Sequence, residues 1–217
     1  MEIIFIPTYY KISDLKNFEN LIKKLPKKIS LVYIKQYEFI AKKILEELEK
    51  KGFEIIKKEG LYGLTVLGCY SEPANTDADI ILLIGNGKFH AKNISRMYNK
   101  RVIVYDPITG NIEEIFENID NKIKILLYKL KESKNIGFLI SIKPGQYYIN
   151  EALKMKKVLE NDNKNVYLFL TNEINFNQIL NFPYIDFWVI FACPRLIDDI
   201  LENNINAITF DYLFKYY

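Results

Sequence analysis

The sequence is poor in cysteine, histidine and long apolar runs. It has two cysteines, Cys69 and Cys193, and one histidine, His90. The amino terminus carries no signal peptide, and two cysteines in a reducing compartment do not predict a structural disulfide. No apolar stretch approaches the roughly 20 residues that a membrane span needs. We therefore expect a cytoplasmic protein without a membrane partner.

An excess of charge of one sign is also missing. The 217 residues include 30 basic and 27 acidic ones, closely interspersed, for a net charge of +3. Such a chain lacks the one-signed field that is typical of nucleic-acid-binding proteins, so we expect no direct nucleic-acid partner. Hydrophobic residues make up 49% of the chain, which is enough for a sizeable core.

Apolar runs of strand length alternate with helical patterns. Runs rich in Ile, Val, Leu and aromatic residues predict buried parallel strands at 2–6, 30–34, 80–84, 102–105, 136–140, 166–170 and 187–192. Apolar stripes predict helices over 14–25, 36–51, 116–132 and 148–160. This order predicts an α/β fold of two similar domains, each a mainly parallel sheet flanked by helices. Because the alternation restarts at Ile136, we place the domains at 1–125 and 126–217.

Four loops follow predicted strands, where ligands of open α/β sheets collect. In the first, Cys69 precedes a short predicted helix, whose dipole favours a thiolate that acts as a ligand or a nucleophile. The alternative is a buried structural cysteine beside a turn glycine. In the second, Gly85 and Gly87 permit close approach of a ligand, ahead of Phe89 and His90. His90 is either a helix-start residue bonded to the backbone or a base or ligand.

The other two loops belong to the second predicted domain. Lys143 is placed to meet a carboxylate, and the backbone at Gly145 and Gln146 to donate hydrogen bonds, although a simple strand-to-helix turn is the alternative. Cys193 lies at the tip of the run 187–192, and Arg195 offers a planar fork for a carboxylate. We expect all four loops to leave their sheets at the carboxyl ends of the strands.

The order of these loops resembles one known family. Leu67-Gly68-Cys69, Gly85-Asn86-Gly87-Lys88-Phe89-His90, Asp106-Pro107, Gly145-Gln146 and Ala192-Cys193-Pro194-Arg195 follow one another as in the second and third domains of the first-step enzymes of diphthamide biosynthesis. The resemblance implies a 4Fe-4S cluster held by one cysteine from each of three similar α/β domains. It also implies S-adenosylmethionine as the substrate, cleaved between sulfur and the γ-carbon. The resulting 3-amino-3-carboxypropyl radical adds to a histidine of translation elongation factor 2.

By this resemblance Cys69 and Cys193 are cluster ligands. The loop from Gly85 and Gly87 through Phe89 to His90 lines the S-adenosylmethionine pocket, together with the residues that the second domain contributes: Lys143, Gly145, Gln146 and Arg195. No residue is assigned a catalytic role.

The resemblance starts at the family's second domain, so the family's first domain and its cysteine have no counterpart here. Two thiolates hold a 4Fe-4S cluster loosely, because such clusters usually have three or four protein ligands. We expect the third ligand from a second protein, from another copy of this chain in a homo-oligomer, or from His90, Glu72 or Asp198.

The leading hypothesis is an iron–sulfur protein of this family that binds S-adenosylmethionine and transfers its 3-amino-3-carboxypropyl group to elongation factor 2 or another acceptor. The alternative is a non-catalytic or partner-dependent subunit without transferase activity of its own. A third possibility, a small nucleotide-binding protein built on Gly85 and Gly87, is weakened because the dinucleotide fingerprint lacks its third glycine.

Overall fold

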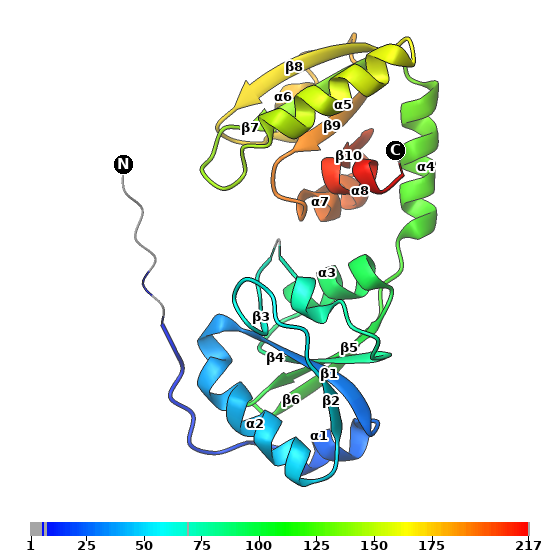
Figure 1. The fold of residues 1–217 in the computed structure, drawn as a ribbon. Coiled ribbons are helices and arrows are strands. Elements are labelled where there is room, and N and C mark those ends of the chain that lie inside the picture. The colour runs from blue at the N-terminus through cyan, green and yellow to red at the C-terminus, as the bar shows by residue number, and fades with distance from the viewer. Residues whose placement is uncertain (1–5, 7, 69, 217) are drawn as a thin grey trace. The chain divides into compact units, whose positions relative to one another are not determined.

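A computed structural model describes residues 6, 8–68 and 70–216. The chain divides into two compact units, Met1–Asn118 and Ile119–Tyr217. Each unit is an α/β sandwich with a mainly parallel sheet flanked by helices, which confirms the predicted fold class (Figure 1). The strand predicted at 2–6 lies outside the described residues except for Ile6, which is not in a strand.

The first unit has a six-stranded sheet in the order β2-β1-β4-β5-β6, with β3 paired to β1. All pairs are parallel except that of β5 and β6. The strands are β1 (Lys28–Ile34), β2 (Glu54–Ile56), β3 (Thr65–Val66), β4 (Ile80–Ile84), β5 (Arg101–Asp106) and β6 (Asn111–Ile115). The helices are α1 (Phe18–Lys24), η1 (Lys35–Tyr37), α2 (Glu38–Lys50), η2 (Glu72–Ala74) and α3 (Phe89–Tyr98).

Both faces of this first sheet are covered. Alternate residues of a strand point to opposite faces, and β4 is buried along its whole length. Ile80, Leu82 and Ile84 pack in the cluster that contains the buried faces of α1 and α2. Ile81 and Leu83 pack in the cluster that contains the buried face of α3. A strand buried on both sides explains why the run 80–84 is apolar throughout rather than alternating.

The second unit has a four-stranded parallel sheet in the order β10-β9-β7-β8. Its strands are β7 (Asn135–Ser141), β8 (Asn165–Thr171), β9 (Phe187–Phe191) and β10 (Ala207–Thr209). Its helices are α4 (Asp120–Glu132), α5 (Ile149–Asn161), α6 (Phe176–Ile179), α7 (Leu196–Glu202) and α8 (Phe210–Tyr216).

The expected division between residues 125 and 126 falls inside α4, whereas the two units separate at 118 and 119. The physical reason is packing. Ile123, Leu126 and Leu130 of α4 are buried in the hydrophobic core of the second unit. The whole helix therefore belongs to that unit.

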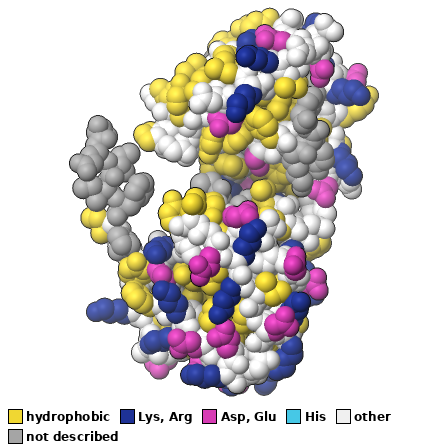
Figure 2. Space-filling model, in the orientation of Figure 1, with side chains coloured by type: hydrophobic (Ala, Val, Ile, Leu, Met, Phe, Trp, Pro, Cys, Tyr) yellow, Lys and Arg dark blue, Asp and Glu magenta, His cyan; other side chains and the backbone are white. Residues whose placement is uncertain are grey.

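The surface is mixed in charge. On the face drawn in Figure 2, Lys and Arg side chains are interspersed with Asp and Glu side chains on both units. Exposed ion pairs such as Arg101 with Glu114, at 2.5 Å, contribute to this pattern. Among the described residues, no helix is both long enough and apolar enough to cross a membrane.

Gly137 in β7 is a position where only glycine fits. A Cβ atom there would lie 2.6 Å from Cε3 and Cζ3 of Trp188, whose ring packs on that face of the sheet. We expect Gly137→Ala to lower the free energy of unfolding of the second unit by about 1–3 kcal/mol, as overpacked cores do. Trp188 is the single tryptophan, so its fluorescence during urea unfolding reports on this unit. An unchanged midpoint would contradict the close packing described.

Candidate functional site

The loop after β4 is shaped by its two glycines. The Gly85 amide donates to the Tyr105 carbonyl at 3.0 Å, which keeps the backbone against β5. A Cβ atom on Gly85 would clash with the Ile34 side chain, coming 2.8 Å from Cγ1. Gly87 has a φ of +70°, a conformation that disfavours other residues. The loop then enters α3 at Phe89.

Phe89 ties this loop to the segment that precedes Cys69. A Cβ atom on Gly68 would lie 2.7 Å from Phe89 Cε1, so the ring packs directly on the Gly68 backbone. Asn93 Nδ2 of the same helix donates to the Gly68 carbonyl at 3.4 Å. The His90 ring meets the Phe89 ring edge to face at 5.0 Å. The first unit thus brings the two predicted loops together, while Cys69 itself lies outside the described residues.

Glu72, one of the expected alternative ligands, is engaged elsewhere. Its carboxylate forms an ion pair of 2.5 Å with Lys58. Leu67 and Tyr70 exchange backbone hydrogen bonds of 2.7 and 3.3 Å. The Tyr70 hydroxyl accepts a hydrogen bond of 2.9 Å from the Leu61 amide. These contacts fix both flanks of the segment that contains Cys69.

The steric limit at Gly85 gives a test of this loop. Gly85→Ala places a methyl group against Ile34 and should lower the free energy of unfolding of the first unit by about 1–3 kcal/mol. Adding Ile34→Ala removes Cγ1 and Cδ1, the two Ile34 atoms that would clash, so the double variant should lose less stability than the two single variants combined. Amide hydrogen exchange in β4 measures the free energy of unfolding of the three variants. Strictly additive losses would contradict the contact between residue 85 and Ile34.

In the second unit, the loop after β7 forms a tight turn. Ser141 is buried, and its Oγ accepts a hydrogen bond of 3.2 Å from the Lys143 amide. The Gln146 amide donates to the Lys143 carbonyl at 3.0 Å, and Gly145 has a φ of +77°. Pro144 followed by glycine at positive φ is typical of a type II turn. The turn uses the Gln146 amide as a donor, and the assignment of Gln146 to the substrate pocket stays a prediction. Lys143 is exposed.

The loop after β9 presents a thiol and a guanidinium group. Cys193 is half-buried and free, and its carbonyl accepts a hydrogen bond of 3.1 Å from the Leu196 amide at the start of α7. The Arg195 side chain is 13% exposed, and its Nη2 lies 2.5 Å from Asp198 Oδ2. The Arg195 guanidinium group, which was expected to bind a ligand carboxylate, thus already binds the Asp198 carboxylate. The same pair engages Asp198, another of the expected alternative ligands.

The sheet register brings these two loops to one edge. β7 and β9 are parallel neighbours, with Ile140 opposite Phe191. Their carboxyl ends therefore meet, and the loops at 142–148 and 192–195 leave the sheet side by side. Neighbouring strands lie about 4.8 Å apart. The second unit thus gathers its predicted site residues at the edge where ligands of parallel sheets bind.

A third strand reaches the same edge and was missed in the sequence. β10 is parallel to β9, with Thr209 opposite Ile190, and it is followed directly by α8. Thr209 is fully buried. Asp211 in α8 has a pKa raised by burial to about 6, although the nearby Thr209 hydroxyl and the amides of Asp211 and Tyr212 lower it in part. A three-residue strand is too short to show a periodic signal.

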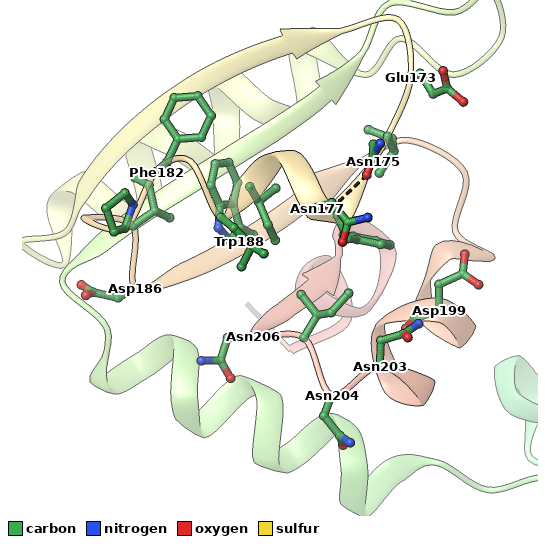
Figure 3. Close-up of a pocket in the computed structure, with 17 residues that line it drawn as sticks. Glu173, Asn175, Asn177, Phe182, Asp186, Trp188, Asp199, Asn203, Asn204 and Asn206 are labelled. Atoms are coloured by element: carbon green, nitrogen blue, oxygen red, sulfur yellow. Dashed lines mark hydrogen bonds between the residues drawn. The ribbon is translucent and has the colours of Figure 1, made fainter.

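The described residues of the second unit also line a pocket of about 820 Å³ (Figure 3). Its walls are the β8–β9 connection and the connection between α7 and β10. Trp188 is among the lining residues, and Asn175 Oδ1 accepts a hydrogen bond of 2.9 Å from the Asn177 amide. None of the site residues expected from the sequence lines this pocket. Asparagine is common throughout this chain, so the asparagines that line the pocket did not mark a binding site in the sequence.

Metal-ligating side chains do not gather within the described part of the chain. Among residues 6, 8–68 and 70–216, no three His, Cys, Asp or Glu side chains are close enough together to hold a metal ion. Cys193 is the one thiol in that set.

Comparison with known proteins gives a consistent result. The family model for diphthamide synthesis proteins matches residues 1–202. A 2-(3-amino-3-carboxypropyl)histidine synthase from Pyrococcus horikoshii is 32% identical over 205 residues, covering 90% of this chain and 60% of the relative. Subunit 1 of such a synthase from Yarrowia lipolytica is 29% identical over 140 residues, covering 62% of this chain and 32% of the relative.

A solved structure agrees with the sequence relatives. The crystal structure of Dph2 from Pyrococcus horikoshii with a 4Fe-4S cluster superposes with a TM-score of 0.77 at 28% identity. The superposition covers 93% of this chain and 62% of that one. The chain thus spans about three fifths of the length of these archaeal proteins.

Proposed function

Because the chain belongs to the diphthamide synthesis protein family, we propose that it is an iron–sulfur protein that transfers the 3-amino-3-carboxypropyl group of S-adenosylmethionine. The acceptor in this proposal is a histidine of elongation factor 2. The observation that carries the proposal is the half-buried free thiol of Cys193, at the carboxyl edge of a parallel sheet. A protein of the same family contains a 4Fe-4S cluster.

The donor chemistry of Cys193 fits such a cluster, because clusters are held by cysteine thiolates. We assign Cys193 and Cys69 as ligands. Gly68, next to Cys69, is packed against Phe89, which supports a site formed by the first two loops. When bound, the cluster would supply the electron that splits the bond between sulfur and the γ-carbon. A cluster usually has three or four protein ligands, so the proposal requires at least one ligand besides these two thiols.

The residues around the thiols would bind and orient the substrate. Gly87 exposes backbone near the start of α3, where a bound group can approach closely. Arg195 would exchange Asp198 for the substrate carboxylate, since a guanidinium binds carboxylates in a planar, two-bonded arrangement. Lys143, exposed on the neighbouring loop, would add a second positive charge. Gln146 would contribute its side chain, because the turn already uses its amide.

The test is cleavage of S-adenosylmethionine by the anaerobically reconstituted chain after reduction with dithionite. The proposal predicts 5′-methylthioadenosine, the fragment left when the bond from sulfur to the γ-carbon breaks. Release of 5′-deoxyadenosine instead, or intact substrate in the presence of a full cluster, would contradict it.

A second function is favoured by one observation. A relative from Yarrowia is named as subunit 1 of such a synthase. The second candidate is a partner-dependent subunit without transferase activity of its own. It predicts cleavage only when a second member of the family is added to the reaction.

A further inference from the structure

The pocket of about 820 Å³ in the second unit is separate from the predicted cluster and substrate site (Figure 3). Its lining residues include neither Cys193 nor Arg195, nor any residue of the loop after β7. They come instead from the β8–β9 connection, from β9 and α7, and from the connection that leads to β10. Its volume lies within the range of about 300–1,000 Å³ that is usual for ligand sites. A ligand here would contact side chains that the proposed function does not use.

The lining of this pocket is acidic. It includes the carboxylates of Glu173, Asp186 and Asp199, and no Lys or Arg is among its described lining residues. Asp186 Oδ2 accepts hydrogen bonds of 3.0 and 2.7 Å from two backbone amides. Lys129 reaches the same region, where its amine donates to Asn206 Oδ1 at 2.8 Å rather than to a carboxylate. Within the described part of the chain, none of the three carboxylates forms an ion pair. A ligand that carries a positive charge therefore fits this lining best.

Trp188 contributes a buried hydrogen-bond donor to the same lining. Its side chain packs against the sheet, and the residue is 4% exposed. The backbone amide donates to the Asn206 carbonyl at 2.9 Å, whereas the indole N–H has no acceptor among the described residues. An indole N–H only donates, and it usually has a partner when it is buried. An unpaired donor on a lining residue indicates a ligand that presents an acceptor, such as a carbonyl oxygen.

The remaining lining combines amides with apolar surface. Five asparagines line the pocket, and the side chains of Asn177 and Asn204 form no hydrogen bond with a described residue. An amide side chain both donates and accepts, which matches the N–H and C=O of a peptide group. Leu180 is 75% exposed, and Phe176 and Phe182 are half-buried. These apolar side chains suit the aliphatic stem of a long side chain.

We propose that this pocket binds a basic peptide segment of a partner protein. A lysine or arginine of the segment lies along the apolar side chains, with its charge towards Glu173 and Asp199. A backbone carbonyl of the segment accepts the hydrogen bond that the Trp188 indole N–H donates, and the asparagines pair with its peptide groups. This inference does not rest on the proposed function, because none of the lining residues is assigned to the cluster or to S-adenosylmethionine.

The experiment is an NMR titration of the isotopically labelled full chain with three capped dipeptides. N-acetyl-leucyl-lysine amide carries both the charge and the carbonyl groups. In the two control peptides, norleucine replaces lysine to remove the charge, and glutamate replaces it to reverse the charge. Trp188 is the single tryptophan, so its indole N–H gives one resonance. The lysine peptide should shift this resonance saturably, and both controls should bind at least about threefold more weakly, the effect of an exposed charge pair.

A matched pair of variants tests the carboxylates. Asp199→Asn should weaken binding of the lysine peptide about threefold and leave the norleucine peptide unaffected. Asp162→Asn, which alters an exposed acid of the same unit outside the pocket, should leave both unaffected. An unchanged urea midpoint of Trp188 fluorescence shows that each variant is folded. Equal affinity of the native chain and Asp199→Asn for the lysine peptide would overturn the charge pairing. Equal binding of the three peptides, or no shift of the indole resonance up to about 10 mM peptide, would overturn the peptide site.

Discussion

Replacing Cys193 by serine is expected to abolish incorporation of iron and sulfide. The thiolate is the ligand form of cysteine, and a serine hydroxyl is not ionised at neutral pH. The change is nearly isosteric, and the hydrogen bond from the Leu196 amide goes to the backbone carbonyl of residue 193, so the fold should persist. The measurement is the iron and sulfide content after anaerobic reconstitution, with the absorbance near 400 nm.

Two controls accompany this variant. Cys69→Ser should cause the same loss, because the proposal makes both thiols ligands. Thermal unfolding of Cys193→Ser should match that of the native chain without a cluster, which separates ligand loss from misfolding. Full cluster content in both serine variants would place the ligands elsewhere.

Asp211→Asn is expected to stabilise the second unit at pH 8. Burial raises the pKa of this carboxyl group from 3.8 to about 6, which corresponds to about 3 kcal/mol. The folded state therefore holds the proton more tightly than the unfolded state does. Stability is highest below pH 4, falls as the pH rises from 4 through 6, and stays low above that range. Asparagine carries no charge, so the variant avoids this loss.

Urea unfolding followed by Trp188 fluorescence measures the effect, because Trp188 lies in β9 beside β10. The variant should exceed the native chain by about 3 kcal/mol at pH 8, and the difference should shrink towards zero at pH 4. Asp162→Asn should show no such dependence. Equal stability of Asp211→Asn and the native chain at pH 8 would mean that the carboxylate is well compensated.

The strand pattern could be predicted from the sequence where the apolar runs have the length of a strand. The run 80–84 coincides with β4, and 136–140 and 166–170 lie within β7 and β8. β6 was missed because its sequence, Asn-Ile-Glu-Glu-Ile, belongs to an exposed edge strand with little apolar character. It forms because Asp106 accepts hydrogen bonds from the Ile108 amide and the Thr109 hydroxyl, which closes a hairpin turn.

The candidate site shows the same limits. The position of Cys193 at a strand end follows from the apolar run before it, and the structure describes it there. The use of the Gln146 amide within a turn depends on the φ of Gly145, which a sequence does not contain. Phe210, the neighbour of Asp211, stacks on Phe191, a contact between distant segments that a local pattern does not show. Local patterns therefore located the loops but not their hydrogen bonds.

The central claim is that this chain takes up an iron–sulfur cluster through Cys69 and Cys193. Counting iron and sulfide in the native chain after anaerobic reconstitution tests it most directly. The account predicts a brown protein with a broad band near 400 nm and about four iron and four sulfide atoms per cluster. A colourless protein without iron would contradict it.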